Sequence, residues 1–260
     1  MQLTILNEKK HEPNKRYLVN CKRNDGFGAQ FQTIIFYILY AEFNGLEFVY
    51  NKIDEIQHNY DNNPLFLENV NNFINIKGNT LDISNINTDY IVDVPLTHIY
   101  RTVESNIDLY TNNNPSFNKI KECFWKNKDR NVFKNNKINI AVHIRRPNIH
   151  MDEVEERYTC DSYFLTIISY IRTKYKNSEL LFHIYSQGEL SNFECYKNTD
   201  TELHIDDDLI STFLGLVGAE ILVMSRSSFS YSAALLSDGE VYYLPFWHTP
   251  RQNWIGVNYK

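Results

Sequence analysis

The fold is decided by the stretch Ile138 to Asn148 (INIAVHIRRPN), an apolar run that ends in charged residues. Its first part, Ile138 to Ile144, is typical of a buried strand. After a loop, a helix is expected over Asp161 to Lys176, and Leu180 to Tyr185 is expected to form the next strand. Because strands that alternate with helices are typical of a parallel, doubly wound sheet, the second half is predicted to be α/β.

The same alternation continues to the end of the chain. We expect a short helix near Glu189 to Tyr196 and, after it, alternating strands and helices. The expected strands are Thr201 to Ile205, Ile221 to Met224 and, as the final one, Val241 to Leu244; the expected helices are Asp207 to Ala219 and Phe229 to Leu236.

The first half begins with a strand, a glycine loop and a helix. Tyr17 to Cys21 is β-prone, Ala29 to Phe43 has a helical period, and Leu46 to Tyr50 is expected to be a second strand. A crossover helix between two strands predicts a parallel β-α-β unit. Asn51 to Pro115 shows little periodicity, and Phe117 to Phe133 is expected to be helical.

Lys134 to Lys137 (KNNK) is typical of a connector between domains. The chain is therefore predicted to hold two α/β domains, residues 1–134 and 135–260, with a cleft between them. A length of 260 residues is enough for two cores.

Composition excludes several classes of function. The net charge of −6 gives no basic field for a nucleic-acid backbone, so nucleic acid is not an expected partner. The polar start, Met1 to Lys10, lacks the apolar core of a secretory signal, and no run reaches about 18 apolar residues. We therefore expect a cytoplasmic protein without a membrane span.

The first candidate site lies at the end of the Ile138 strand. His143, Arg145 and Arg146 are placed where ligands bind in open α/β sheets, beyond the carboxyl ends of the strands. Guanidinium groups match phosphate oxygens with forked hydrogen bonds. The alternative is that both arginines form surface ion pairs with the acidic residues between positions 152 and 156.

The second candidate site is Ser225 to Ser230 (SRSSFS), which lies between a strand and a helix. Hydroxyls and backbone amides at a helix N-terminus can bind an anion. The same residues would also serve as ordinary helix caps, and both roles are compatible.

The third candidate is Asp25 to Gln30 (DGFGAQ), a glycine turn that opens a helix. It lacks the third glycine of a dinucleotide fingerprint and the lysine of a P-loop. Taken alone, it predicts a tight turn.

Together, these motifs resemble those of the fucosyltransferase superfamily, which includes the α-1,2-, α-1,6- and protein O-fucosyltransferases. Gly26-Phe27-Gly28-Ala29-Gln30 resembles the family's glycine loop, and His143, Arg145 and Arg146 match its H-x-R-R motif. Ser227-Ser228-Phe229-Ser230 matches the S-S-F-S motif of the α-1,2 enzymes, and Pro245-Phe246-Trp247 resembles the family's closing stretch. The motifs span nearly the whole chain.

The resemblance implies a GT-B-like fold with two Rossmann-like domains, GDP-fucose as donor, a glycan hydroxyl as acceptor, inversion at the anomeric carbon, and no cofactor or metal. Arg145 and Arg146 would bind the diphosphate, and Arg146 would also balance the charge of the departing GDP. His143 and Asp206 would lie near the nucleoside. The remaining donor-binding residues would be Gly26, Gly28, Gln30, Ser227, Ser228, Phe229 and Ser230.

The general base is expected to be Glu153 or Asp25. Glu153 lies ten residues after His143, the offset of the base proposed in α-1,6 enzymes. Asp25 could serve equally as an Asx-turn residue beside Gly26. Pro147 and Asn148 depart from the family pattern, in which an aspartate follows the second arginine.

Two patterns could suggest a metal, but each has a simpler explanation. Asp206-Asp207-Asp208 resembles a D-x-D motif, yet Asp207 or Asp208 would cap the helix that follows. His58, His98, His183 and His248 show no i, i+4 pairing and are interpreted as structural.

Two other functions stay open beside fucosyl transfer. The same fold could use another nucleotide sugar, or the chain could be a non-catalytic module that binds a nucleotide or sugar. Turnover of the donor would separate an enzyme from such a module.

Overall fold

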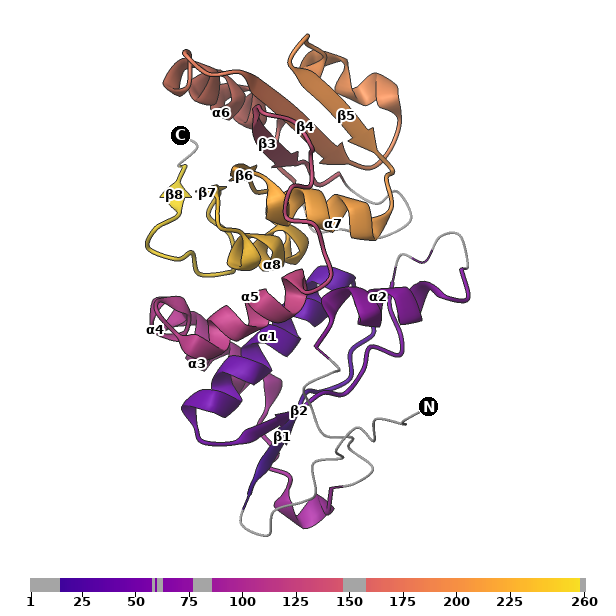
Figure 1. The fold of residues 1–260 in the computed structure, drawn as a ribbon, viewed down its shortest axis with the longest axis vertical. Coiled ribbons are helices and arrows are strands. Elements are labelled where there is room, and N and C mark those ends of the chain that lie inside the picture. The colour runs from indigo at the N-terminus through magenta and orange to yellow at the C-terminus, as the bar shows by residue number, and fades with distance from the viewer. Residues whose placement is uncertain (1–14, 58, 60–62, 77–85, 147–157, 258–260) are drawn as a thin grey trace, which may run out of the picture. The chain divides into compact units, whose positions relative to one another are not determined.

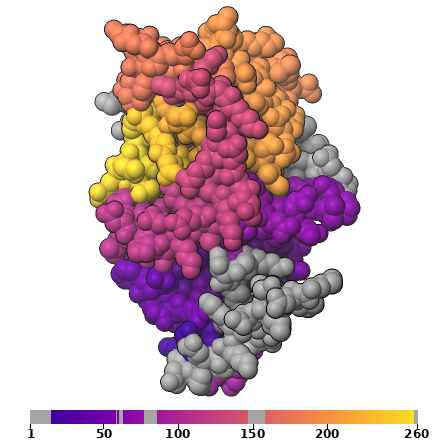
Figure 2. All heavy atoms as spheres, viewed as in Figure 1, coloured from indigo at the N-terminus to yellow at the C-terminus, as the bar shows by residue number. Residues whose placement is uncertain are grey.

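The computed structural model describes residues 15–57, 59, 63–76, 86–146 and 158–257. The chain divides into two compact units, Met1–Lys126 and Asn127–Lys260 (Figure 1). The connector predicted at Lys134 to Lys137 therefore lies within unit 2. Figure 2 shows residues 127–137 on the surface of this unit.

Unit 2 contains a six-stranded sheet with the order β5-β4-β3-β6-β7-β8, in which every pair of neighbours is parallel. This confirms the α/β class and the parallel sheet. The strands are β3 (Ile138–His143), β4 (Leu180–Ser186), β5 (Thr201–Ile205), β6 (Ile221–Val223), β7 (Glu240–Tyr243) and β8 (Ile255–Gly256). The expectation that the strand near Val241 is the last one was wrong, because β8 pairs with β7. A strand of two residues is too short to show the alternating pattern of a β-strand in the sequence.

Helices cover both faces of this sheet (Figure 1). The apolar face of α6 (Asp161–Lys174), with Phe164 and Ile171 fully buried, packs in one cluster with Val142 of β3 and Ile184 of β4. The short helix η5 (Leu190–Tyr196) joins the same cluster. On the other face lie α7 (Leu209–Gly218) and α8 (Ser228–Leu236).

The chain changes direction in the sheet at β3. From β3 it moves outward through β4 to β5, and it then returns through α7 to β6 on the other side of β3. The neighbours β3 and β6 therefore form a topological switch point, where connections leave in opposite directions. In open α/β sheets, ligands bind at such points, beyond the carboxyl ends of the strands.

Unit 1 begins with the predicted β-α-β unit. Strands β1 (Tyr17–Val19) and β2 (Glu47–Val49) are parallel, and α1 (Phe27–Phe43) connects them. The helices that follow are α2 (Phe66–Ile74), η3 (Thr88–Tyr90), α3 (Leu96–Glu104), α4 (Ile107–Thr111) and α5 (Pro115–Trp125). Phe124 on α5 contacts Phe31 on α1, with ring centroids 6.3 Å apart.

Two expectations for unit 1 need correction. The helix expected to reach Phe133 ends at Trp125, because Lys126 leaves the helical region and Asn127 has a φ of 65°. Within its described residues, the weakly periodic stretch before Pro115 contains four short helices, α2, η3, α3 and α4. Each buries at most a few apolar positions, such as Val70 on α2 and Ile99 on α3, so its period was hard to detect.

No helix within the described ranges is long and apolar enough to cross a membrane.

The junction between β6 and β7 gives a test of the packing. A Cβ atom on Gly239 would lie 2.6 Å from the carbonyl oxygens of Ala219 and Glu220. Because these are backbone atoms, we expect Gly239→Ala to lower the free energy of unfolding by about 1–3 kcal/mol in urea titrations. Gly256→Ala is the control, since its Cβ would meet nothing within 4 Å, and we expect a change within about 0.5 kcal/mol. Equal stabilities would contradict this packing.

Candidate functional site

The switch point of unit 2 brings together the two strongest sequence motifs. His143 is the last residue of β3, and Ser225 follows β6. Nδ1 of His143 lies 2.7 Å from Oγ of Ser225, so a hydrogen bond joins the two motifs at the switch point. The ring of Phe229, in the first turn of α8, lies 5.4 Å from the His143 ring. The structure thus unites residues that are about 80 positions apart in the sequence.

His143 is held in its neutral form. Burial, together with the nearby charge of Arg145, lowers the pKa of His143 from 6.5 to about 3. A neutral imidazole can accept or donate one hydrogen bond without adding to the positive charge of the site. The cationic groups beside it are therefore the arginines.

Arg146 is fixed by contacts on two sides. Its Nη2 donates to Oδ1 of Asp161, at the first position of α6, over 2.5 Å. The guanidinium carbon lies 5.1 Å from the ring centroid of Phe193 in η5. Tyr196 donates to the same oxygen of Asp161, also over 2.5 Å. Burial acts to lower the pKa of Arg146, but the hydrogen bond and charge of Asp161 outweigh it and raise that pKa.

The other arm of Arg146 has no hydrogen-bond partner within the described part of the chain. Its Nη1 is buried, and among the described residues it makes no hydrogen bond. The side chain as a whole is only 14% exposed. Oγ1 of Thr159, two residues before Asp161, is likewise buried without a partner in the described part of the chain. Because buried donors are nearly always satisfied, Nη1 of Arg146 could donate a hydrogen bond to an anionic group.

The serines of the second motif mostly have structural partners. Ser227 caps α8 by accepting from the backbone N–H of Phe229 over 3.2 Å. Ser230 is fully buried and donates to the carbonyl groups of Ser225 and Ser227. Oγ of Ser228 lies 2.9 Å from Nε2 of His248, which also accepts from Trp247 over 3.1 Å. The capping interpretation is confirmed, and it leaves the backbone of the α8 N-terminus beside His143.

The acidic run after β5 forms local contacts. Asp208 caps α7 by accepting from the N–H groups of Ile210 and Ser211, as the simpler explanation predicted. Asp206 has a φ of 59°, and its carboxylate lies 3.2–3.3 Å from the N–H of Gly188. Asp206 comes directly after β5, so it lies at the carboxyl end of that strand, as His143 does for β3. Strand β4 lies between β5 and β3. Its role near a nucleoside stays a prediction.

In unit 1 the glycine motif has an ordered, buried structure. Gly26 is the N-cap residue of α1 with a φ of −68°, and Gly28 is buried in the first turn. Nε2 of Gln30 donates to the carbonyl groups of Asp25 and Glu55, so Gln30 ties the loop to a later segment. The contacts that the structure gives Gln30 are thus internal to unit 1.

Of the two candidate bases, only Asp25 lies within the described residues. Its carboxylate accepts from both Nε and Nη2 of Arg23, and this pairing raises the pKa of Arg23. Among the described residues this carboxylate pairs with Arg23 and not with a backbone N–H, so the Asx-turn alternative is not observed. Glu153 lies outside the described residues, as do Pro147 and Asn148 and the acidic residues once considered as partners of the arginines.

Sequence reasoning missed three residues that hold Arg146. Asp161, Phe193 and Tyr196 come from α6 and η5, and only the sheet brings them to the loop after β3. The one sign of these contacts in the sequence was Asp161, a carboxylate in the first turn of the helix that follows β3.

The neutral state of His143 predicts how stability depends on pH. An unfolded chain protonates this residue below about pH 6.5, whereas the folded chain resists protonation to about pH 3, so stability falls as pH falls through this window. Between pH 6.5 and pH 5, we expect the free energy of unfolding of the wild-type protein to fall by about 2 kcal/mol more than that of His143→Gln. Urea titrations at both pH values measure the difference. His183, whose pKa burial lowers to about 4, contributes equally to both proteins and cancels. Parallel pH profiles would contradict the assignment.

No protein-family model and no curated protein matches the chain. Among solved structures, it is similar to the fucosyltransferase NodZ from Bradyrhizobium, with 10% identity over 86% of this chain and 94% of that chain, and a TM-score of 0.41. A variant of Arabidopsis thaliana FUT1 in complex with GDP shows 11% identity over 96% and 73%, with a TM-score of 0.41. The E. coli heptosyltransferase WaaC with ADP-2-deoxy-2-fluoro heptose shows 12% identity over 92% of both chains, with a TM-score of 0.42.

Proposed function

We propose that this chain is an inverting glycosyltransferase whose donor is a nucleotide diphosphate sugar. The observation that carries the proposal is the switch point of unit 2, where His143 and Ser225 meet, together with Arg146 three residues later, whose buried Nη1 has no hydrogen-bond partner among the described residues. Ligands bind at such points in open α/β sheets, and a fixed guanidinium with a spare donor suits a phosphate oxygen.

Fucose as the transferred sugar and GDP as the nucleotide are the more specific part of the proposal. They rest on the resemblance of the H-x-R-R and S-S-F-S motifs to those of fucosyltransferases, together with the meeting of these motifs at one switch point. The acceptor would be a hydroxyl group of a glycan. Another nucleotide sugar on the same site is the first alternative.

The reaction follows from charge. The acceptor oxygen attacks the anomeric carbon while the bond from that carbon to the phosphate oxygen breaks, which inverts the carbon. Negative charge grows on the departing diphosphate, and Arg145 and Arg146 would stabilise it. The acceptor proton passes to a carboxylate, for which Asp25 and Glu153 are the candidates, or leaves late in a loose transition state. If Asp25 is the base, it must loosen its pairing with Arg23.

The identity of the donor can be tested by thermal shift and calorimetry with GDP, UDP, dTDP and CMP in metal-free buffer. We expect GDP to stabilise the protein selectively, by about 2.7 kcal/mol at a concentration of 100 Kd. A preference for UDP or dTDP would discard fucose and keep the transferase. Binding of GDP without any turnover would favour a non-catalytic module, and no binding to any nucleotide would contradict the proposed site.

Arg146→Ala tests the phosphate contact. We expect it to weaken binding of the preferred nucleotide by about 10-fold or more, the scale of a hydrogen bond to a charged group. Arg172→Ala is the matched control, because Arg172 also pairs with a carboxylate, Asp200, and stacks 4.9 Å from the ring of Phe182. That pair lies before β5, at the opposite edge of the sheet, and its loss should leave affinity unchanged.

Turnover gives the second readout for Arg146. We expect Arg146→Ala to remove at least about 2 kcal/mol of transition-state stabilisation, which lowers kcat roughly 30-fold. We expect the wild-type protein to stay active in excess EDTA. Arg146→Lys should not restore the rate, because an ammonium group lacks the planar fork that spans Asp161 and a phosphate. An unchanged rate, or activity that returns only with manganese, would contradict the mechanism.

A further inference from the structure

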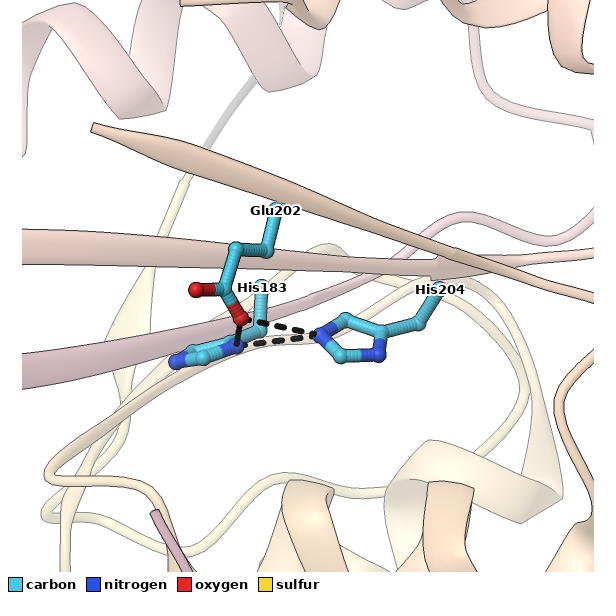
Figure 3. Close-up of side chains that lie close together, drawn as sticks. All are labelled: His183, Glu202 and His204. Atoms are coloured by element: carbon cyan, nitrogen blue, oxygen red, sulfur yellow. Dashed lines mark hydrogen bonds and ion pairs between the residues drawn. The ribbon is translucent and has the colours of Figure 1, made fainter. Parts of the chain in front are cut away.

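Two neighbouring strands of unit 2 place a second cluster of polar side chains on one face of the sheet. His183 on β4 is the direct partner of Glu202 on β5, and His204 lies two residues further along β5. Nδ1 of His183 lies 3.1 Å from Nε2 of His204. The Glu202 carboxylate oxygen lies 3.5 Å from the first nitrogen and 3.8 Å from the second. Figure 3 shows these three atoms pointing toward one another.

The outer nitrogen of His183 must carry a proton. Nε2 of His183 lies 3.2 Å from Oδ1 of Asn139. The orientation of this amide is fixed, because its Nδ2 donates to the carbonyl of Lys137 and to the carboxylate of Glu220. Both of those groups only accept, so the oxygen of Asn139 faces His183 and Nε2 is the donor. The inner Nδ1 of the neutral ring then carries a lone pair.

The outer nitrogen of His204 is protonated for the same reason. Nδ1 of His204 lies 3.0 Å from Oδ2 of Asp207, and an ionised carboxylate only accepts. When His204 is neutral, its inner Nε2 therefore also presents a lone pair. Two imidazole lone pairs and a carboxylate oxygen thus converge, and a cation between them would satisfy all three.

The distances fit a first-row metal ion. With Zn–N and Zn–O bonds near 2.1 Å, ligand atoms of a tetrahedral zinc site lie about 3.4 Å apart. The three separations here are 3.1, 3.5 and 3.8 Å. Asn139 and Asp207 supply the outer hydrogen bonds that typically orient zinc-binding histidines.

We propose that His183, Glu202 and His204 form a zinc site that joins the edge strand β5 to β4. Imidazole and carboxylate ligands suit zinc, and solvent supplies the fourth ligand, since Glu202 is 55% exposed. On the other side, the ring of Phe133 stacks on His183 at 4.2 Å, and the ring of Tyr185 stacks on His204 at 4.6 Å. Of the three ligands, Glu202 is the most exposed to solvent, whereas His183 is buried.

This site is separate from the proposed phosphate contacts. His183 is paired with Ala141, two residues before the end of β3. The proposed zinc would stabilise the sheet edge and would take no part in transfer.

The test is zinc binding to the full chain after chelator treatment and dialysis into metal-free buffer, measured by competition with a chromogenic chelator. We expect one tightly bound zinc per chain and a rise in Tm on its addition. His204→Ala and Glu202→Gln should each weaken binding at least about 10-fold, and Asp207→Ala by about 10-fold through loss of the outer hydrogen bond. Cobalt should give the visible absorption of a tetrahedral site.

Glu179→Gln is the matched control, since Glu179 is an exposed carboxylate just before β4, and it should bind zinc like wild type. Absence of stoichiometric zinc binding to wild type, or equal binding by the ligand variants, would overturn the proposal. A Tm that varies with pH but not with zinc would indicate a proton shared between the two histidines, and would also overturn it. Nucleotide binding by the zinc-free protein is a separate readout, so the two proposals can fail independently.

Discussion

Strand β3 pairs with β4 on one side and with β6 on the other, and the position of the candidate site depends on this double pairing. Its middle residues, Ile140 to Val142, are fully buried, so their backbone groups need partners on both sides. The chain meets this requirement by running outward from β3 and then returning to its other side. The consequence is a topological switch point at the carboxyl ends of β3 and β6, where His143 and Ser225 meet.

The difference between Arg146 and Arg172 shows how the same interactions can serve structure or binding. Each guanidinium pairs with an aspartate and lies over a phenylalanine ring. Arg172 uses both Nε and Nη2 on Asp200, whereas Arg146 uses only Nη2 on Asp161 and leaves Nη1 buried without a described partner. An unsatisfied buried donor opposes folding, so its retention at a switch point favours a ligand contact over a structural role.

The sequence predicted those elements whose residues carry a strong local signal. The strand Thr201–Ile205 was predicted at its observed bounds, and the α8 helix was predicted one residue short at its start. Local pattern could not predict what depends on pairing: β8 has two residues, and the partners of Arg146 come from α6 and η5. His183 and His204 were likewise missed as a pair, because spacing rules for helices do not apply to residues that meet through strand register.

The alternation of side chains along β3 decides which residues of unit 2 lie on the same face of the sheet. Asn139, Ala141 and His143 share one face of β3, so the amide that orients His183 and the imidazole at the switch point belong to the same row. Four residues of extended strand separate Asn139 from His143 by about 13 Å. Under the proposed function, the charge of a departing diphosphate would be met by the arginines and the α8 N-terminus. The neutral state of His143 would leave the positive charge on these groups, which can hold a phosphate with fixed geometry.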